Sequence, residues 1–202
     1  MEKVLIFIKH NFSFLWNIIE FFNSFLLQLL YGTQISSTVS KFKDYYNINQ
    51  NYSIKILGKS NLEELNDFLV TLDNDSFQYF KPHNMDKKSL KVVLNKNSML
   101  KFGFYDKEKN LIGYFILRMF FNKKCFIGRL VHPNFRGQGI AKEMSKILYC
   151  ISKELGFNVY STISKDNVAS LNSHKKVNNY TIEKELEKDF YLIKFNLEDY
   201  KC

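Results

Sequence analysis

The sequence lacks any paired cysteine motif. Its three cysteines, Cys125, Cys150 and Cys202, are odd in number and widely spaced. Zinc sites and disulfide frameworks place cysteines at short, regular spacings, and this chain has neither pattern. We therefore expect no bound metal, and we expect the three thiols to be reduced, as in an intracellular protein.

The chain also lacks the concentrated basic stripe that is typical of nucleic-acid-binding proteins. It has 29 Lys and Arg against 20 Asp and Glu, a formal net charge of +9, but the cations gather only in pairs such as Lys123-Lys124. We expect no nucleic-acid partner. A phosphate-bearing cofactor and an anionic membrane surface are the anionic partners that this charge suits.

The hydrophobic run over residues 4–31 lacks the features of a secretory signal, because no small-residue cleavage site follows it. Its polar residues recur every three or four positions and therefore predict a narrow polar stripe on an amphipathic helix. We expect this helix within residues 1–36, with a stop near Gly32, and a connector over 37–50. Three uses of the run remain open: contact with a membrane interface, packing on the domain or on a second copy as a homodimer, and a membrane span.

A single domain is predicted over residues 51–202, with short apolar runs alternating with helical patterns. Its first helix begins with a capping box at Ser60-Asn61-Leu62-Glu63. Strands are expected at 52–57, 99–105, 111–120, 124–131, 158–164, 180–185 and 190–195, and helices at 62–72, 87–94, 139–155 and 167–176. This order predicts an α/β (α+β) fold with a mixed sheet and helices on both faces.

The segment Arg136-Gly137-Gln138-Gly139-Ile140-Ala141 connects the end of a strand to the start of a helix. The first amides of a helix have no partner within it, and the helix dipole adds partial positive charge there. Two glycines let the backbone approach a bulky anion, so the segment predicts a phosphate or pyrophosphate site. The absence of a Gly-Lys-Ser/Thr ending excludes a P-loop, and the glycine spacing does not fit a dinucleotide-binding loop.

The spacing Arg136-x-x-Gly139-x-Ala141, preceded by Val131-x-Pro133, resembles the signature of the GNAT superfamily of acyl-CoA-dependent acyltransferases. A second segment, Asn167-x-x-Ser170-x-x-x-His174, is similar to the family's Asn-x-x-Ala/Ser-x-x-x-Tyr segment. The resemblance implies the GNAT fold, with a central sheet splayed between its fourth and fifth strands. It also implies acetyl-CoA as co-substrate and direct acetyl transfer, without a covalent enzyme intermediate.

The resemblance further implies roles for individual residues. The pyrophosphate, the pantetheine arm and the thioester would contact Leu130, Val131, Arg136, Gly137, Gln138, Gly139, Ile140, Ala141, Asn167 and Ser170. His174 stands where the family often has a Tyr that protonates the leaving thiolate, although it can equally be an ordinary polar residue of the helix.

The general base is harder to assign, because residues 124–131 contain no carboxylate. His83, which follows Pro82 in a loop, is the candidate for a base or acceptor-binding residue, whereas His132 is expected to cap the end of its strand. Arg118 and Arg129 either approach the acceptor or are solvated.

The acceptor stays open. We expect an amine or hydroxyl of a small molecule, such as an amino sugar or a lipid-linked sugar of bacterial surface-polysaccharide biosynthesis. Transfer to a protein amino terminus or lysine and a non-catalytic acyl-CoA-binding or scaffolding module are the alternatives. The expected location is cytoplasmic, with peripheral attachment to the inner face of the membrane if the helix binds lipid.

Overall fold

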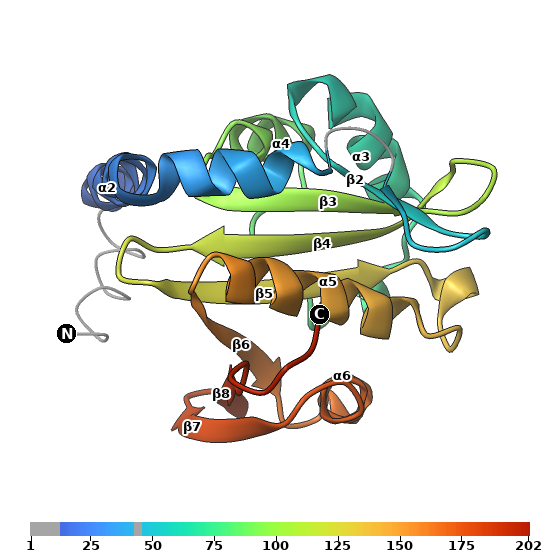
Figure 1. Cartoon of the computed structure of the whole chain (residues 1–202). Coiled ribbons are helices and arrows are strands. Elements are labelled where there is room, and N and C mark those ends of the chain that lie inside the picture. The colour runs from blue at the N-terminus through green and yellow to red at the C-terminus, as the bar shows by residue number, and fades with distance from the viewer. Residues whose placement is uncertain (1–12, 43–45) are drawn as a thin grey trace.

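A mixed sheet forms the centre of the molecule (Figure 1). In a computed structural model, which describes residues 13–42 and 46–202, this sheet has eight strands in the order β1-β2-β3-β4-β5-β6-β8-β7. The strands are β1 Tyr46–Asn47, β2 Ser53–Ile56, β3 Met99–Tyr105, β4 Leu111–Met119, β5 Lys124–Val131, β6 Asn158–Ser164, β7 Tyr180–Leu186 and β8 Phe190–Phe195. All seven predicted strands are confirmed, and β1 is an addition within the predicted connector.

The sheet opens between β5 and β6. These strands are parallel and pair only from Lys124↔Asn158 to Phe126↔Tyr160, after which they diverge. At the start of the gap the Ser161 hydroxyl donates to the Ile127 carbonyl at 3.3 Å. We call the opening between residues 127–131 of β5 and 161–164 of β6 the wedge. It confirms the splay that was expected between the fourth and fifth predicted strands.

Helices cover both faces of the sheet (Figure 1). The long helices α2 (Ser13–Ser40) and α5 (Ile140–Glu154) share one apolar core on one face. The shorter helices α3 (Leu62–Val70) and α4 (Lys87–Leu94) form a second core on the other face. Helix α6 (Val168–Lys175) follows β6. Three short 3₁₀ helices complete the elements: η1 Lys59–Asn61, η2 Asn74–Phe77 and η3 Pro133–Phe135.

Helix α2 extends further than the sequence predicted. The expected stop at Gly32 is wrong, since the helix continues to Ser40 and Gly32 is buried within it. Ile35 and Thr38 are buried beyond this glycine, so packing on the domain outweighs the weak helix propensity of Gly. Packing on the domain was one of the three uses left open for this run. The predicted part of the helix over residues 1–12 lies outside the described residues.

The start of α3 also differs in detail. The helix begins at Leu62 as predicted, but its N-cap is Asn61 rather than Ser60, because the turn η1 takes up Ser60. The predicted capping box is therefore not formed, and the Glu63 carboxylate instead pairs with Lys87 at 2.7 Å.

The cysteine expectation is wrong for two of the three residues. Cys150 on α5 and Cys202 near the end of the chain form a disulfide, with their Cα atoms 5.4 Å apart, and Cys125 is free and buried. The C-terminal segment folds back on α5, where the Lys153 ammonium donates to the carbonyls of Glu198 and Tyr200, each at 2.8 Å. Tertiary packing thus joins cysteines that are 52 positions apart, which no short spacing could indicate.

Candidate functional site

The connection from β5 to α5 is shaped by two glycines. Gly137 and Gly139 have φ angles of 81° and 84°, in the left-handed region that a Cβ disfavours. A Cβ on either glycine would meet no atom within 4 Å, so the space in front of the loop is open. His132 begins the turn η3 before the loop, with its Nδ1 accepting from the Asn134 amide at 3.3 Å. His132 was expected to cap the end of its strand; its side chain instead caps the turn that follows the strand.

Five consecutive amides of this loop have no partner. The N–H groups of residues 137–141 donate to no backbone or side-chain acceptor among the described residues, and the first amide of α5 to find one is that of Lys142, which donates to the Gly139 carbonyl at 2.9 Å. They lie at the positive end of a 15-residue helix. Amides arranged in this way bind the oxygens of a phosphate or pyrophosphate. The side chain of Ile140 is buried, so this residue offers its backbone alone.

Two side chains hold the loop in place. The Arg136 guanidinium donates to the Ser76 hydroxyl at 2.8 Å and to the Val131 carbonyl at 3.3 Å. The Gln138 side chain accepts from the Tyr52 hydroxyl at 3.0 Å. The loop is therefore fixed on both sides, and the charge of Arg136 lies beside the unpartnered amides.

The end of β6 forms the other side of the wedge. Asn167 is the N-cap of α6, and its side-chain oxygen accepts from the Ser170 amide at 3.1 Å. The side-chain NH₂ of Asn167 has no acceptor among the described residues and stays available to a ligand. The structure thus brings Asn167 and the glycine loop to the same open end of the sheet, as the sequence predicted.

Arg129 is a residue of the wedge whose role the sequence did not settle. From β5 its guanidinium donates to the Ala141 carbonyl at 2.7 Å and to the Ser145 hydroxyl. It also contacts the hydroxyls of Ser170 and Ser173 on α6, each at 3.4 Å. Burial lowers its pKa to about 10, which leaves it charged at neutral pH. Arg129 is half-buried, and its contacts join the start of α5 to α6.

Leu130 and Val131 form the β5 side of the wedge. The Leu130 side chain is buried in the second core, below α3 and α4. No strand among the described residues pairs with this edge of β5 beyond Phe126, although the Arg136 guanidinium donates to the Val131 carbonyl there.

His83 lies in the loop before α4 and contacts a buried tyrosine. Its Nδ1 is 2.8 Å from the Asn84 carbonyl and its Nε2 is 3.0 Å from the Tyr114 hydroxyl. Since a carbonyl can only accept, Nδ1 carries the proton and Nε2 accepts from Tyr114. Burial lowers the pKa of His83, with added effects from the charges of Lys96 and Lys101. The imidazole is therefore neutral at neutral pH, as a general base must be.

The same loop packs on the strand that forms the wedge. A Cβ on Gly128 of β5 would lie 3.0 Å from the Phe80 ring, so glycine allows the loop to approach this strand closely. The Phe80 and Tyr114 rings are in edge contact, with centroids 6.0 Å apart. His83 is thus placed beside β5 on the face opposite α5.

His174 is turned into the core. It is 2 % exposed, its Nδ1 lies 2.7 Å from the Tyr149 hydroxyl, and its ring packs on Phe195. Burial lowers its pKa well below the usual value, and the charge of Arg129 adds to this effect. A neutral, enclosed imidazole is poorly suited to protonate a leaving group. The general-acid role of His174 stays a prediction, and this packing does not favour it.

The sequence and the fold can be compared with those of known proteins. Residues 66–180, more than half of the chain, match the acetyltransferase (GNAT) family. The chain belongs to the GNAT acetyltransferase family. No match to a curated protein sequence is found.

Solved structures with the same fold include three acetyltransferases. The ribosomal-protein-S5-alanine acetyltransferase of Vibrio fischeri superposes with a TM-score of 0.65 and 13% identity, over 79% of this chain and 100% of the other. A putative acetyltransferase of Salmonella typhimurium with its cofactor acetyl-CoA superposes with a TM-score of 0.60 and 14% identity, over 75% of this chain and 97% of the other. The spermidine N-acetyltransferase of Vibrio cholerae in complex with CoA and spermine has a TM-score of 0.59 and 18% identity, over 73% of this chain and 94% of the other. At these identities the likeness shows the fold.

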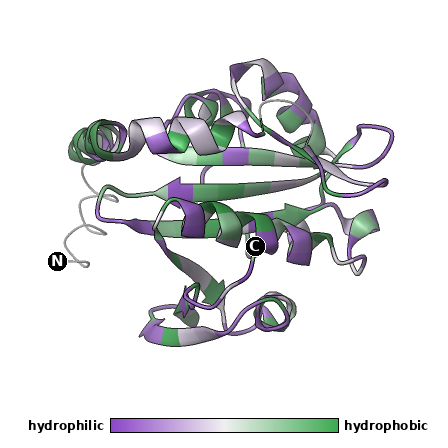
Figure 2. Cartoon of the chain, in the orientation of Figure 1, coloured by the Kyte–Doolittle hydropathy of each residue, from purple (hydrophilic) through white to green (hydrophobic). Residues whose placement is uncertain are grey.

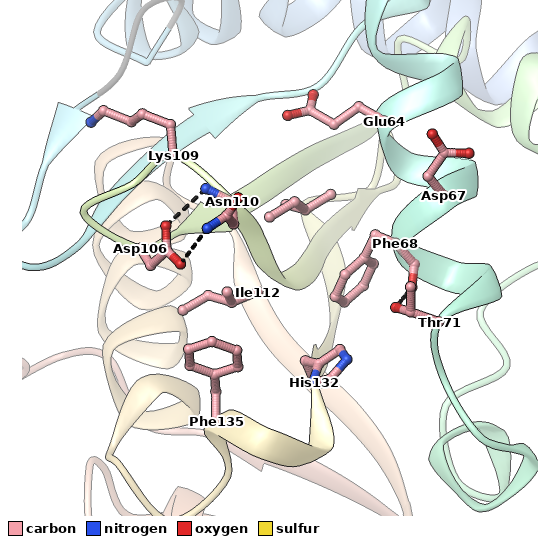
Figure 3. Close-up of a pocket in the computed structure, with 11 residues that line it drawn as sticks. Glu64, Asp67, Phe68, Thr71, Asp106, Lys109, Asn110, Ile112, His132 and Phe135 are labelled. Carbon is pink, nitrogen blue, oxygen red and sulfur yellow. Dashed lines mark hydrogen bonds between the residues drawn. The ribbon is translucent and has the colours of Figure 1, made fainter.

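This GNAT protein also has an acidic hollow beside the β5–α5 connection (Figure 3). Among the described residues it has a volume of about 530 Å³ and takes side chains from α3, the β3–β4 turn and the segment after β5. It contains three carboxylates, those of Glu64, Asp67 and Asp106, together with the rings of Phe68, His132 and Phe135. The sequence did not indicate this hollow, because its acidic residues belong to separate segments.

Proposed function

We propose that this enzyme transfers an acetyl group from acetyl-CoA to a primary amine of a small molecule. The observation that carries the proposal is the row of unpartnered amides over residues 137–141 at the open end of the wedge. They suit the pyrophosphate, and the edge of β5 over residues 127–131, which pairs with no described strand, suits the amide-bearing pantetheine arm. The side-chain NH₂ of Asn167, at the end of the facing strand β6, is a further donor for this arm.

When bound, acetyl-CoA would supply an acetyl thioester. The acceptor, bound as an ammonium, must first lose one proton; the amine nitrogen then bonds to the carbonyl carbon, the carbon–sulfur bond breaks, and the thiolate takes up the second proton that the nitrogen releases. The chain must orient the amine and remove its proton. We assign proton removal to Nε2 of His83, because this imidazole is held neutral. Nε2 either receives the proton through the Tyr114 hydroxyl or gives up its hydrogen bond from that hydroxyl to take the proton directly. A cysteine nucleophile is not invoked, since burial raises the pKa of Cys125 to about 12 and Cys150 is in a disulfide.

The acidic hollow supports an amine as the acceptor. Carboxylates attract an ammonium group, and the aromatic rings of Phe68 and Phe135 add cation–π attraction. Amino sugars, lipid-linked amino sugars and polyamines, such as the spermine bound by the Vibrio cholerae enzyme, all carry such a group. Removal of charge by Glu64→Gln and Asp67→Asn should raise the KM for the amine several-fold without changing kcat, whereas the control Glu183→Gln on β7 should change neither.

Calorimetric titration with acetyl-CoA and CoA tests the first half of the proposal. Micromolar binding is expected, and an absence of binding would exclude an acyl-CoA enzyme. A screen for thiol release should then compare polyamines, amino sugars and amino-terminal peptides as acceptors. Preference for peptides would replace the small-molecule acceptor by a protein, and binding without turnover of any amine would indicate a non-catalytic module.

We also propose a cytoplasmic location at the inner face of the membrane, with homodimerisation as the alternative use of α2. The exposed apolar side chains of this helix support a partner of one of these two kinds.

A further inference from the structure

Helix α2 docks on the domain through its polar side. The Glu20 carboxylate is 9 % exposed and pairs with the Arg118 guanidinium and, at 3.5 Å, with the Lys96 ammonium. The Asn23 side chain, which is also buried, donates to the Met119 carbonyl at 3.2 Å and accepts from the Phe121 amide at 3.1 Å. An amphipathic helix of a water-soluble protein normally buries its apolar side instead. The first half of α2 does the opposite: its polar side faces the domain and its apolar side faces outward.

The inversion leaves the apolar side chains exposed, and the ribbon of α2 is largely coloured as hydrophobic in Figure 2. Eight large apolar residues of α2 are 36–74 % exposed, and we call them the apolar face of α2: Phe14, Leu15, Ile18, Phe21, Phe22, Phe25, Leu29 and Leu30. The four Phe side chains alone expose on the order of 500 Å², taking about 200 Å² for a whole Phe. The largest apolar patch on an ordinary soluble monomer is roughly 300–600 Å² in total. Within residues 13–42 and 46–202, no segment covers the apolar face of α2.

Charge at the margin of this face has one sign. Glu20 is the single charged residue of residues 13–40, and it is turned inward and paired. The β4–β5 turn, which Asn23 binds, carries Phe121, 44 % exposed, and the exposed Lys123 and Lys124. The Lys123 ammonium lies 5.8 Å from the ring centre of Tyr31 on α2, so this cation adjoins the helix.

We propose that the apolar face of α2, together with the β4–β5 turn, binds the surface of a bilayer that contains anionic lipids. The helix lies in the interface, with its Phe and Leu side chains among the acyl chains and with Lys123 and Lys124 at the headgroups. A second copy of the chain suits this surface less well, because the face offers no exposed carboxylate to the two lysines of a partner.

A membrane span is not compatible with the packing of α2. By length and composition alone, residues 14–40 could cross a bilayer. However, the helix is attached to the domain along its length, since Leu27 and Ile35 lie in the core and Gln34 and Lys41 bind Glu154 on α5. A span would have to break these contacts.

The proposed orientation keeps the wedge accessible. The membrane-facing turn precedes Lys124 at the start of β5, whereas the glycine loop follows Val131 at its end. With a rise of about 3.3 Å per residue, the strand separates the two by roughly 23 Å. The cofactor entrance therefore faces water, and membrane binding is expected to leave acetyl-CoA affinity unchanged. The proposal deepens the membrane location proposed above and is independent of whether the enzyme acetylates an amine.

Flotation of the full-length protein with vesicles tests the proposal. Vesicles of phosphatidylcholine with about 30% phosphatidylglycerol should bind the protein, and pure phosphatidylcholine should bind it more weakly. Phe21→Glu combined with Phe25→Glu should lower the partition coefficient at least 100-fold, because each substitution removes on the order of 100 Å² of buried apolar surface. Lys123→Gln with Lys124→Gln should lower binding to the anionic vesicles about 30-fold. The matched control, Val92→Glu with Ile182→Glu, adds the same charges at exposed apolar positions of α4 and β7 and should bind like the wild type.

Each result of these experiments either supports or excludes membrane docking of α2. A thermal melt and an acetyl-CoA titration, both unchanged in every variant, show that folding and the cofactor site are intact. If the wild type does not float with the vesicles, or if Phe21→Glu with Phe25→Glu floats as well as the control, membrane docking is excluded. A wild-type dimer in sedimentation that becomes a monomer with these two substitutions, without vesicle binding, would assign the face to a second copy.

Discussion

Replacement of Gly139 by Ala separates the backbone role of this glycine from its proposed role in ligand binding. A Cβ at φ 84° costs about 1 kcal/mol or slightly more in backbone energy, but it meets no protein atom within 4 Å. For a chain of this length, 1 kcal/mol corresponds to a Tm lower by about 2–4 °C. The new methyl group would project into the open space in front of the unpartnered amides. It should displace a bound pyrophosphate from at least one charge-assisted hydrogen bond, which weakens acetyl-CoA binding by about 10- to 150-fold.

Gly156 supplies the matched control. It has a φ of 70°, its Cβ would also meet nothing within 4 Å, and it lies after the other end of α5. Gly156→Ala should therefore show the same loss of Tm with unchanged acetyl-CoA affinity by calorimetric titration. If Gly139→Ala binds acetyl-CoA as tightly as Gly156→Ala, the amides over residues 137–141 do not form the pyrophosphate site.

Three further predictions concern other residues. His83→Gln should lower kcat about 10²- to 10⁴-fold at unchanged acetyl-CoA affinity. In the wild type, kcat should rise with pH with its midpoint below pH 6.5, because burial lowers the pKa of His83, and a midpoint above pH 7 would exclude His83 as the base. The folded chain holds His174 neutral, whereas the unfolded chain protonates it near pH 6.5, so the free energy of unfolding should fall as the pH drops below about 6.5. Urea titrations should show a smaller fall for His174→Gln than for the wild type. An equal fall in both proteins would contradict the burial of His174. Cys202→Ser should lower the free energy of unfolding by up to about 4 kcal/mol, the value for a cross-link over 52 residues, and a reductant should do the same to the wild type but not to the variant.

Local patterns predicted the elements well, and they also predicted the helix-opening glycine loop and the start of the helix at Asn167. The glycine loop and the N-cap Asn167 depend on residues close in sequence, and backbone rules alone place their amides and side chains. The capping contact of His132 is also local, because it reaches only two residues along the chain to the Asn134 amide.

Features that depend on distant contacts could not be predicted in this way. Periodicity indicated a polar stripe on α2 but not which side would meet the domain, because the choice depends on Arg118 and on the β4–β5 turn, about 100 residues away. The burial of His174 against Tyr149 and the pairing of Cys150 with Cys202 have the same origin. Sequence spacing carries no information on such packing.

Arg129 limits how the wedge can move. Its guanidinium binds both Ala141 on α5 and two serines of α6, so the helices cannot separate without leaving a buried charge partly unpaired. A hinged separation of α5 from α6 is therefore disfavoured. The first turn of α5 and the whole of α6 should then behave as one unit in amide hydrogen exchange, opening together rather than in turn.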